Sequence, residues 1–195
     1  MLTFLAILMT SFTYGQPETD ASGKFYNSYQ DYLDKKPIPG IDVYGVGLGS
    51  VEVKNNGIPE KFKDTKLPSA FFTNSNGMLM RAFEDYMYYV LVDGPLCYYL
   101  KRVEGIVNIT PQGQFSYSRN YRDDVTFDYY SETTSGEIKK LKDKVLDSYL
   151  EKYNLTAQYK SDKPKREMED NVDDYKSKLK NRTAKYIKLI NEKMK

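Results

Sequence analysis

The middle of the chain, from about residue 43 to residue 130, has a hydrophobic pattern with a period of two. Apolar and polar side chains alternate over residues 50–54 (SVEVK), which predicts a half-buried strand. Residues 87–92 (MYYVLV) and 96–100 (LCYYL) are instead dense runs of β-branched and aromatic side chains. Such runs suit central strands that are covered on both faces, so we expect the core to lie here.

Three turn signals divide this region into hairpins. Asn56-Gly57, Asn76-Gly77 and Asp93-Gly94 each lie between two runs that are able to form strands. Asn-Gly and Asp-Gly supply the positive φ angles of a type I′ turn, whose twist matches the flanking strands. The predicted pairs are 50–55 with 58–63, 70–75 with 78–83, and 86–92 with 95–102. Further predictions are a turn at Glu84-Asp85, a pairing of 105–110 with 114–120 through Gln112-Gly113, and a last strand over 124–130.

Helical spacing appears on both sides of the strand region. Phe25, Tyr29 and either Tyr32 or Leu33 follow one another at helical intervals before Pro37 and Pro39, which predicts a short N-terminal helix. After residue 130, Thr134-Ser135-Gly136-Glu137 fits a capping box. The stripe that follows predicts a helix that ends near Asn154, and its apolar positions are Ile138, Leu141, Val145, Tyr149, Leu150 and Tyr153.

A final helix is predicted from about Asp162-Lys163-Pro164, because proline is tolerated in the first turn of a helix. Acidic residues are concentrated near its start and lysines near its end, which complements the helix dipole. The basic end fits either a contact with an anionic surface or a solvated face, and we interpret it as a solvated face. The apolar stripe of this helix is Met168, Val172, Tyr175, Leu179, Tyr186, Ile190 and Met194.

The opening stretch differs from the rest of the chain, because residues 2–12 are mostly apolar and no charged side chain appears before Glu18. A membrane-spanning helix needs about 20 apolar residues, and this run is about half as long. A short apolar run followed by small or neutral residues is typical of a secretory signal peptide. We therefore expect residues 1–15 to be a signal peptide cleaved after Gly15, rather than a buried strand or helix, and no transmembrane span after its removal.

Together these patterns predict an α+β protein. It consists of an antiparallel β-meander of about six to nine strands, with a short N-terminal helix and C-terminal helices packed on it. The expected organisation is an N-terminal helical segment over 16–42, the meander over 43–130 and the helices over 131–195, with 16–195 forming one domain.

Composition narrows the chemistry. The chain has no histidine, which excludes Ser-His-Asp and Cys-His catalysis and the usual zinc, copper and non-haem iron sites. The single cysteine, Cys97, lies in a hydrophobic run and is expected to be a buried side chain rather than a nucleophile. The net charge of +2 is too near neutral to indicate a nucleic-acid partner. We therefore expect no catalytic residue, no cofactor and no metal site.

Two motifs have a functional and a structural interpretation. Residues 44–49 (YGVGLG) are similar to a phosphate-binding loop, but a strand rather than a helix follows, so the glycines are expected to permit a bend or bulge. The acidic pairs Glu84-Asp85, Asp123-Asp124 and Asp173-Asp174 do not act alone, because neighbours in a strand point to opposite faces. Asp124 and Asp128 share a face of the predicted last strand, which leaves a histidine-free hydrolase with two carboxylates as an alternative.

Tyrosine is unusually abundant, with 19 residues and no tryptophan. Tyrosine combines a wide contact area with a polar tip and is favoured at interfaces, although it also serves in ordinary core and rim packing. The most interface-like stretch, and our candidate interaction surface, consists of Tyr117, Arg119, Tyr121, Arg122, Tyr129 and Tyr130.

The layout of the whole chain resembles small exported proteins of Bacteroidota-type bacteria that have no assigned function. The resembling features are the signal ending in Gly15-Gln16, the stretches GKFYNSYQDYLDKKP and FFTNSNGMLMRAFEDYMYYVLVDG, and the helical C-terminus. The resemblance implies export to the periplasm, the cell envelope or the extracellular space, and it implies no catalytic residues.

The leading function hypothesis is a non-catalytic envelope or extracellular protein that binds another macromolecule. A carrier of small apolar ligands is an alternative if the meander closes into a barrel with a cavity. The histidine-free hydrolase is the third hypothesis.

Overall fold

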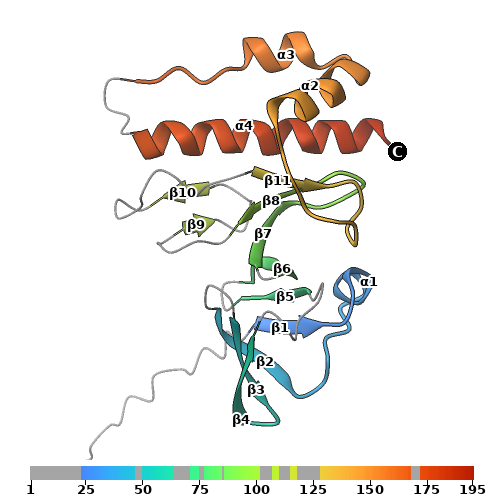
Figure 1. Ribbon diagram of the computed structural model, residues 1–195, viewed down its shortest axis with the longest axis vertical. Coiled ribbons are helices and arrows are strands. Elements are labelled where there is room, and N and C mark those ends of the chain that lie inside the picture. The colour runs from blue at the N-terminus through green and yellow to red at the C-terminus, as the bar shows by residue number, and fades with distance from the viewer. Residues whose placement is uncertain are drawn as a thin grey trace, which may run out of the picture.

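The structure is a computed structural model, shown in Figure 1. It describes residues 23–46, 50–63, 71–74, 77–84, 86–101, 107–109, 115–117, 128–167 and 172–195. The expected signal peptide at residues 1–15 lies outside these ranges. The strands form one end of the molecule and the C-terminal helices form a layer at the other end (Figure 1).

Ten strands form one open antiparallel sheet, in the order β12-β11-β8-β7-β6-β5-β1-β2-β3-β4, and β9 pairs with β10 separately. The α+β class and the C-terminal helices are therefore confirmed, while the strand count is higher than predicted. The strands are β1 (Gly23–Tyr26), β2 (Ile41–Val46), β3 (Ser50–Asn55), β4 (Ile58–Lys63), β5 (Phe71–Thr73), β6 (Leu79–Phe83), β7 (Tyr86–Val92), β8 (Cys97–Lys101), β9 (Val107–Ile109), β10 (Phe115–Tyr117), β11 (Asp128–Ser131) and β12 (Lys139–Lys140).

The predicted hairpins are present. β3 pairs with β4 through Asn56 and Gly57, which have φ angles of 49° and 83°, as a type I′ turn requires. β5 pairs with β6, and β7 pairs with β8. The last predicted strand is β11, which is described over Asp128–Ser131, while residues 124–127 lie outside the described ranges. A register shift between Val43 and Gly45 confirms an irregularity in the glycine-rich segment, although residues 47–49 lie outside the described ranges.

The connection at Asp93-Gly94 is not the predicted type I′ turn. Gly94 has a φ of 140°, but Asp93 is not in the positive-φ region. Four residues, 93–96, join β7 to β8, and Val92 is paired with Tyr98. The reason lies in Pro95, whose ring fixes a negative φ and removes a hydrogen-bond donor directly after the glycine.

The predicted N-terminal helix is not confirmed. Phe25 lies in strand β1, and only a single helical turn, α1 (Tyr29–Leu33), follows. Ser28 caps this turn, because its side chain accepts a hydrogen bond from the Asp31 amide. β1 pairs with β2 on one side and with β5 on the other, so the sheet is not a simple meander.

The capping box predicted at Thr134–Glu137 does not begin a helix. Lys139 and Lys140 instead form β12 and pair with Tyr130 and Tyr129 of β11. Ile138 is buried on the sheet, and the helix begins only at Asp143. The helix ends as expected, because Asn154 has a φ of 57°. The C-terminal helices are α2 (Asp143–Lys152), α3 (Thr156–Ser161) and α4 (Val172–Lys193).

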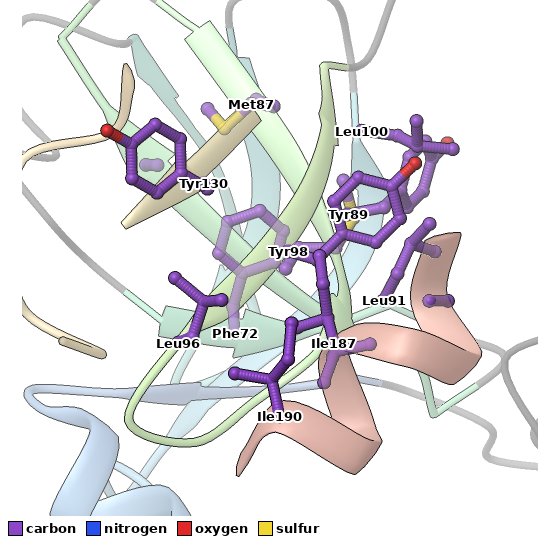
Figure 2. Packing of buried hydrophobic residues seen from close by; sticks show 14 of the residues in the cluster. Phe72, Met87, Tyr89, Leu91, Leu96, Tyr98, Leu100, Tyr130, Ile187 and Ile190 are labelled. Carbon is purple, nitrogen blue, oxygen red and sulfur yellow. The ribbon is translucent and has the colours of Figure 1, made fainter. Parts of the chain in front are cut away.

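Helix α4 packs across β7 and β8, and α2 packs against α4. The helix does not extend back to Pro164 as predicted, since residues 163–167 are not helical. Tyr186, Ile187 and Ile190 are fully buried, and Tyr186 packs against Tyr159 of α3. Figure 2 shows Ile187 and Ile190 on the side of α4 that faces Tyr98 of β8 and Leu96 of the β7–β8 connection. This contact closes the main core, which continues along the sheet to Phe25 and Val43.

The open sheet has β4 and β12 at its edges. The closed sheet on which the carrier alternative depends is therefore not formed by the described strands. None of the helices in the described ranges combines the length and the apolar character that crossing a membrane requires.

Candidate interaction surface

The predicted tyrosine- and arginine-rich surface is only partly within the described residues. Arg119, Tyr121 and Arg122 lie outside them, and of Tyr117 only its place in β10 is described. Tyr129 and Tyr130 are neighbours in β11, so their side chains point to opposite faces. Tyr130 is 9% exposed and belongs to the core under α4. The structure therefore does not bring Tyr130 to one surface with Tyr129.

The face of the sheet that points away from α4, called here the outer face, is rich in aromatic side chains. Alternation along β6, β7, β8 and β11 places these residues there, and the buried ones form a cluster apart from the main core. A second small cluster on this face packs Tyr29 of α1 against Phe71 of β5. The outer-face residues of these four strands are Arg81, Phe83, Tyr86, Tyr88, Val90, Cys97, Tyr99, Lys101, Tyr129 and Ser131.

Arg81 lies at the centre of the outer face and is completely buried. Its guanidinium donates hydrogen bonds to the Tyr99 hydroxyl at 3.1 Å and to the Gly136 carbonyl at 2.6 Å. The guanidinium also lies over three aromatic rings, those of Phe71, Phe83 and Tyr99. Among the described residues no carboxylate pairs with it, and its Nε has no partner. Arg81 thus connects the strands of this face through hydrogen bonds and ring contacts with neutral groups, and not through an ion pair with a described residue.

A short polar network extends from Arg81. The Tyr99 hydroxyl shares a hydrogen bond of 2.9 Å with the Ser131 hydroxyl, which donates to the Thr133 carbonyl. Cys97 is 1% exposed, as predicted, and its thiol donates to the Gly94 carbonyl. Burial raises the pKa of the Cys97 thiol, although hydrogen bonds from neighbouring groups oppose the shift. A thiol with a raised pKa is a poor nucleophile at neutral pH.

The exposed margin of the outer face is formed by Tyr86, Lys101 and Tyr129, called here the Tyr86 patch. The Tyr86 side chain is 43% exposed, and the Lys101 Nζ lies 2.8 Å from the centre of its ring. Tyr129 packs edge-on against the buried Tyr88, with ring centres 5.2 Å apart. Burial raises the pKa of Tyr88 and of Tyr129, so both phenols stay neutral at physiological pH. The patch therefore presents hydroxyls, ring surface and one cation on a rigid base.

Of the two carboxylates predicted to share a strand face, only Asp128 lies within the described residues. Asp128 accepts a hydrogen bond of 2.5 Å from the Tyr98 hydroxyl and forms an ion pair with Lys180 of α4. These contacts attach β11 to the helix. Asp85, Asp123 and Asp124 lie outside the described residues, so the proposed sharing of a face by Asp124 and Asp128 is untested. The described residues hold no group of three or more acidic or thiol side chains that is able to bind a metal ion.

Sequence reasoning missed Arg81, Tyr86 and Lys101. The alternation in residues 86–92 and 97–101 could have placed Tyr86 and Lys101 on one face, because the predicted hairpin pairs these two strands. Nothing in the sequence around Arg81 distinguishes a buried arginine from one at a sheet edge.

Comparison with known proteins gives no relatives: no family model, no curated protein and no solved structure matches the chain.

Proposed function

We propose that this is an exported, non-catalytic protein that binds another protein of the cell envelope or the extracellular space. The binding surface is the Tyr86 patch on the outer face of the sheet. The expectation of export is supported by the apolar opening stretch, and mass spectrometry of the native protein should find a chain that begins at Gln16.

The observation that carries the proposal is the exposure of Tyr86 beside Lys101. Tyrosine rings on a rigid base give contact area at a low cost in side-chain entropy, and they are enriched among the residues that dominate binding energy. Tyr86 lies on the same face of β7 as the buried Tyr88, against which Tyr129 packs, so a packed layer adjoins the patch and limits its rearrangement when a partner binds. Lys101 favours a partner surface with a carboxylate near an apolar group.

Site-specific photocrosslinking in the organism of origin tests the proposal. A photoreactive phenylalanine analogue replaces Tyr86 in one strain and Tyr44 in another. Tyr44 is a matched control, because it is 45% exposed and lies on β2, towards the other end of the sheet. We expect a discrete adduct from position 86 that is absent from position 44.

A second substitution makes the result specific to the patch. Lys101→Glu reverses the charge beside position 86 and should strongly reduce the adduct, while the purified variant keeps the melting temperature of the parent. The same adducts from both positions, or an adduct that Lys101→Glu leaves unchanged, would contradict the proposal.

A further inference from the structure

A groove on the helical layer carries a concentration of positive charge. It lies between the end of α3 and the middle of α4 and has a volume of about 390 Å³. Lys163, Lys178, Arg182 and Lys185 line it, with Asp162 as the carboxylate in its wall. We call this site the basic groove. Lys178 and Lys185, which belong to the lysines interpreted from sequence as a solvated face, thus line this groove.

Arg182 is held beside the groove by an aromatic side chain. Its guanidinium lies 4.0 Å from the centre of the Tyr159 ring, and Tyr159 packs edge-on against the fully buried Tyr186. This stack holds the guanidinium in one orientation. Within the described part of the chain Arg182 makes no hydrogen bond or ion pair, and its Nε is buried without a partner. The terminal nitrogens of Arg182 therefore have no described protein partner that a ligand would have to displace, whereas the buried Nε is out of reach.

The acidic side chains near the groove neutralise only part of its charge. Asp162 accepts a hydrogen bond of 2.6 Å from Lys185 and another of 3.3 Å from the Tyr186 hydroxyl. Glu167 lies 3.8 Å from Lys178 in a pair that is open to solvent. Lys163 is exposed, and an excess of positive charge remains around Arg182.

We propose that the basic groove binds a phosphate monoester. A phosphate monoester carries a charge of about −1.5 to −2 at neutral pH, and its oxygens match the fork of an arginine better than they match a lysine. The groove is shallow and largely open to solvent, so a small group attached to the phosphate, such as a glycerol or a sugar, is able to point outward. This site goes beyond the proposed protein contact at the Tyr86 patch, since it lies on the helices rather than on the outer face.

The ligand chemistry has two sources, a soluble phosphate monoester and a lipid headgroup, which two probes distinguish. Glycerol 3-phosphate is titrated into the full chain by NMR, with glycerol as the probe that lacks phosphate. Vesicles of phosphatidylcholine with and without phosphatidic acid are then tested by co-sedimentation. We expect shifts of groove residues with glycerol 3-phosphate and not with glycerol. Binding only to phosphatidic acid vesicles assigns the site to a lipid headgroup.

Three variants locate the binding. Arg182→Gln should weaken binding by at least about tenfold, because it removes a charge-assisted pair. Lys163 is exposed and makes no described contact within the protein. Its replacement in Lys163→Gln should therefore weaken binding without affecting folding. Lys54→Gln, an exposed lysine on β3 at the other end of the molecule, is the control for net charge and should bind like the parent.

Two results would overturn the site. The first is the absence of binding by either probe. The second is a loss of affinity that is as large for Lys54→Gln as for Lys163→Gln, which would mean that only the overall charge matters.

Discussion

The backbone of the β7–β8 connection requires a glycine at position 94. Its φ of 140° is unfavourable for any other residue, and a Cβ built there would lie 2.7 Å from the Nδ2 of Asn191. The glycine therefore serves both the turn and the approach of helix α4.

We predict that Gly94→Ala lowers the free energy of unfolding by about 1–3 kcal/mol. Gly57→Ala is the matched control. Gly57 also has a positive φ, of 83°, but nothing lies within 4 Å of the position of its Cβ, so only the backbone cost applies. Urea unfolding of both variants checks the difference. Equal losses would mean that the contact with Asn191 is unimportant.

Cys97 is expected to be unreactive while the protein is folded. Its side chain is 1% exposed and burial raises the pKa of the thiol, so both access and thiolate fraction are low near neutral pH. A thiol reagent at pH 8 should label the native chain far more slowly than the chain in denaturant. Labelling at the same rate in both conditions would show that the outer face opens readily.

At the scale of elements, helix α4 is fastened to the sheet by one side chain as well as by its apolar face. The Asn191 amide accepts a hydrogen bond from the Leu96 amide at 2.8 Å and donates one to the Leu96 carbonyl at 2.8 Å. It also donates to the Asp93 carbonyl at 3.3 Å. The helix therefore pairs both backbone groups of Leu96 and the carbonyl of Asp93 in this connection.

Asn191→Ala should lower the free energy of unfolding by about 1–3 kcal/mol, because it leaves buried backbone groups of Leu96 unpaired. Lys188→Ala, at an exposed position on the same helix, should change it by less than about 0.5 kcal/mol. Thermal melts of the two variants give the comparison, and indistinguishable melts would show that the apolar face alone holds the helix.

Elements set by local chemistry were predictable from sequence. The β3–β4 hairpin matches its prediction residue for residue, because the two-residue turn at Asn56-Gly57 fixes the register. β1 was not predictable, since Phe25 and Tyr29 fit helical spacing and the partners β2 and β5 come later in the chain. β12 was missed for a similar reason, because Lys139 is in a strand only through its pairing with Tyr130.

The candidate site was harder to predict than the fold. Tyr129 was identified from its neighbours in sequence, but Tyr86 and Lys101 join it only when β7, β8 and β11 lie side by side. Of the cations in the basic groove, Lys178 and Lys185 belong to the lysine-rich part of the last helix that the sequence analysis noted. Their convergence on Arg182 depends on α3 returning along α4, which no local pattern indicates.

At the scale of the whole molecule, buried tyrosines make the free energy of unfolding depend on pH in the alkaline range. Burial raises the pKa of a phenol because the phenolate is poorly solvated. The pKa of Tyr149 is raised to about 12, mainly by burial and then by its hydrogen bond to Glu132. The described tyrosines with a raised pKa are Tyr29, Tyr32, Tyr88, Tyr99, Tyr129, Tyr149 and Tyr186.

We therefore predict alkaline unfolding. A phenol has a pKa of about 10 in the unfolded chain. The folded state holds these protons more tightly, so their contribution to stability is complete below pH 10 and is lost as the pH rises towards 12 and above. Urea unfolding at pH 8 and pH 11, with absorbance at 295 nm to follow ionisation, checks this. Equal stability at both values would contradict the burial of these rings.

The central claim is that the Tyr86 patch, and not exposed tyrosine in general, binds the partner. The most direct test is the affinity of the crosslinked partner, once purified, for Tyr86→Ser and Tyr44→Ser variants, measured by calorimetry. Both side chains are more than two-fifths exposed, at 43% and 45%, so neither substitution opens a cavity in the core. We predict that Tyr86→Ser weakens binding by at least about tenfold, while Tyr44→Ser binds like the parent. Equal affinities for the two variants would contradict the claim.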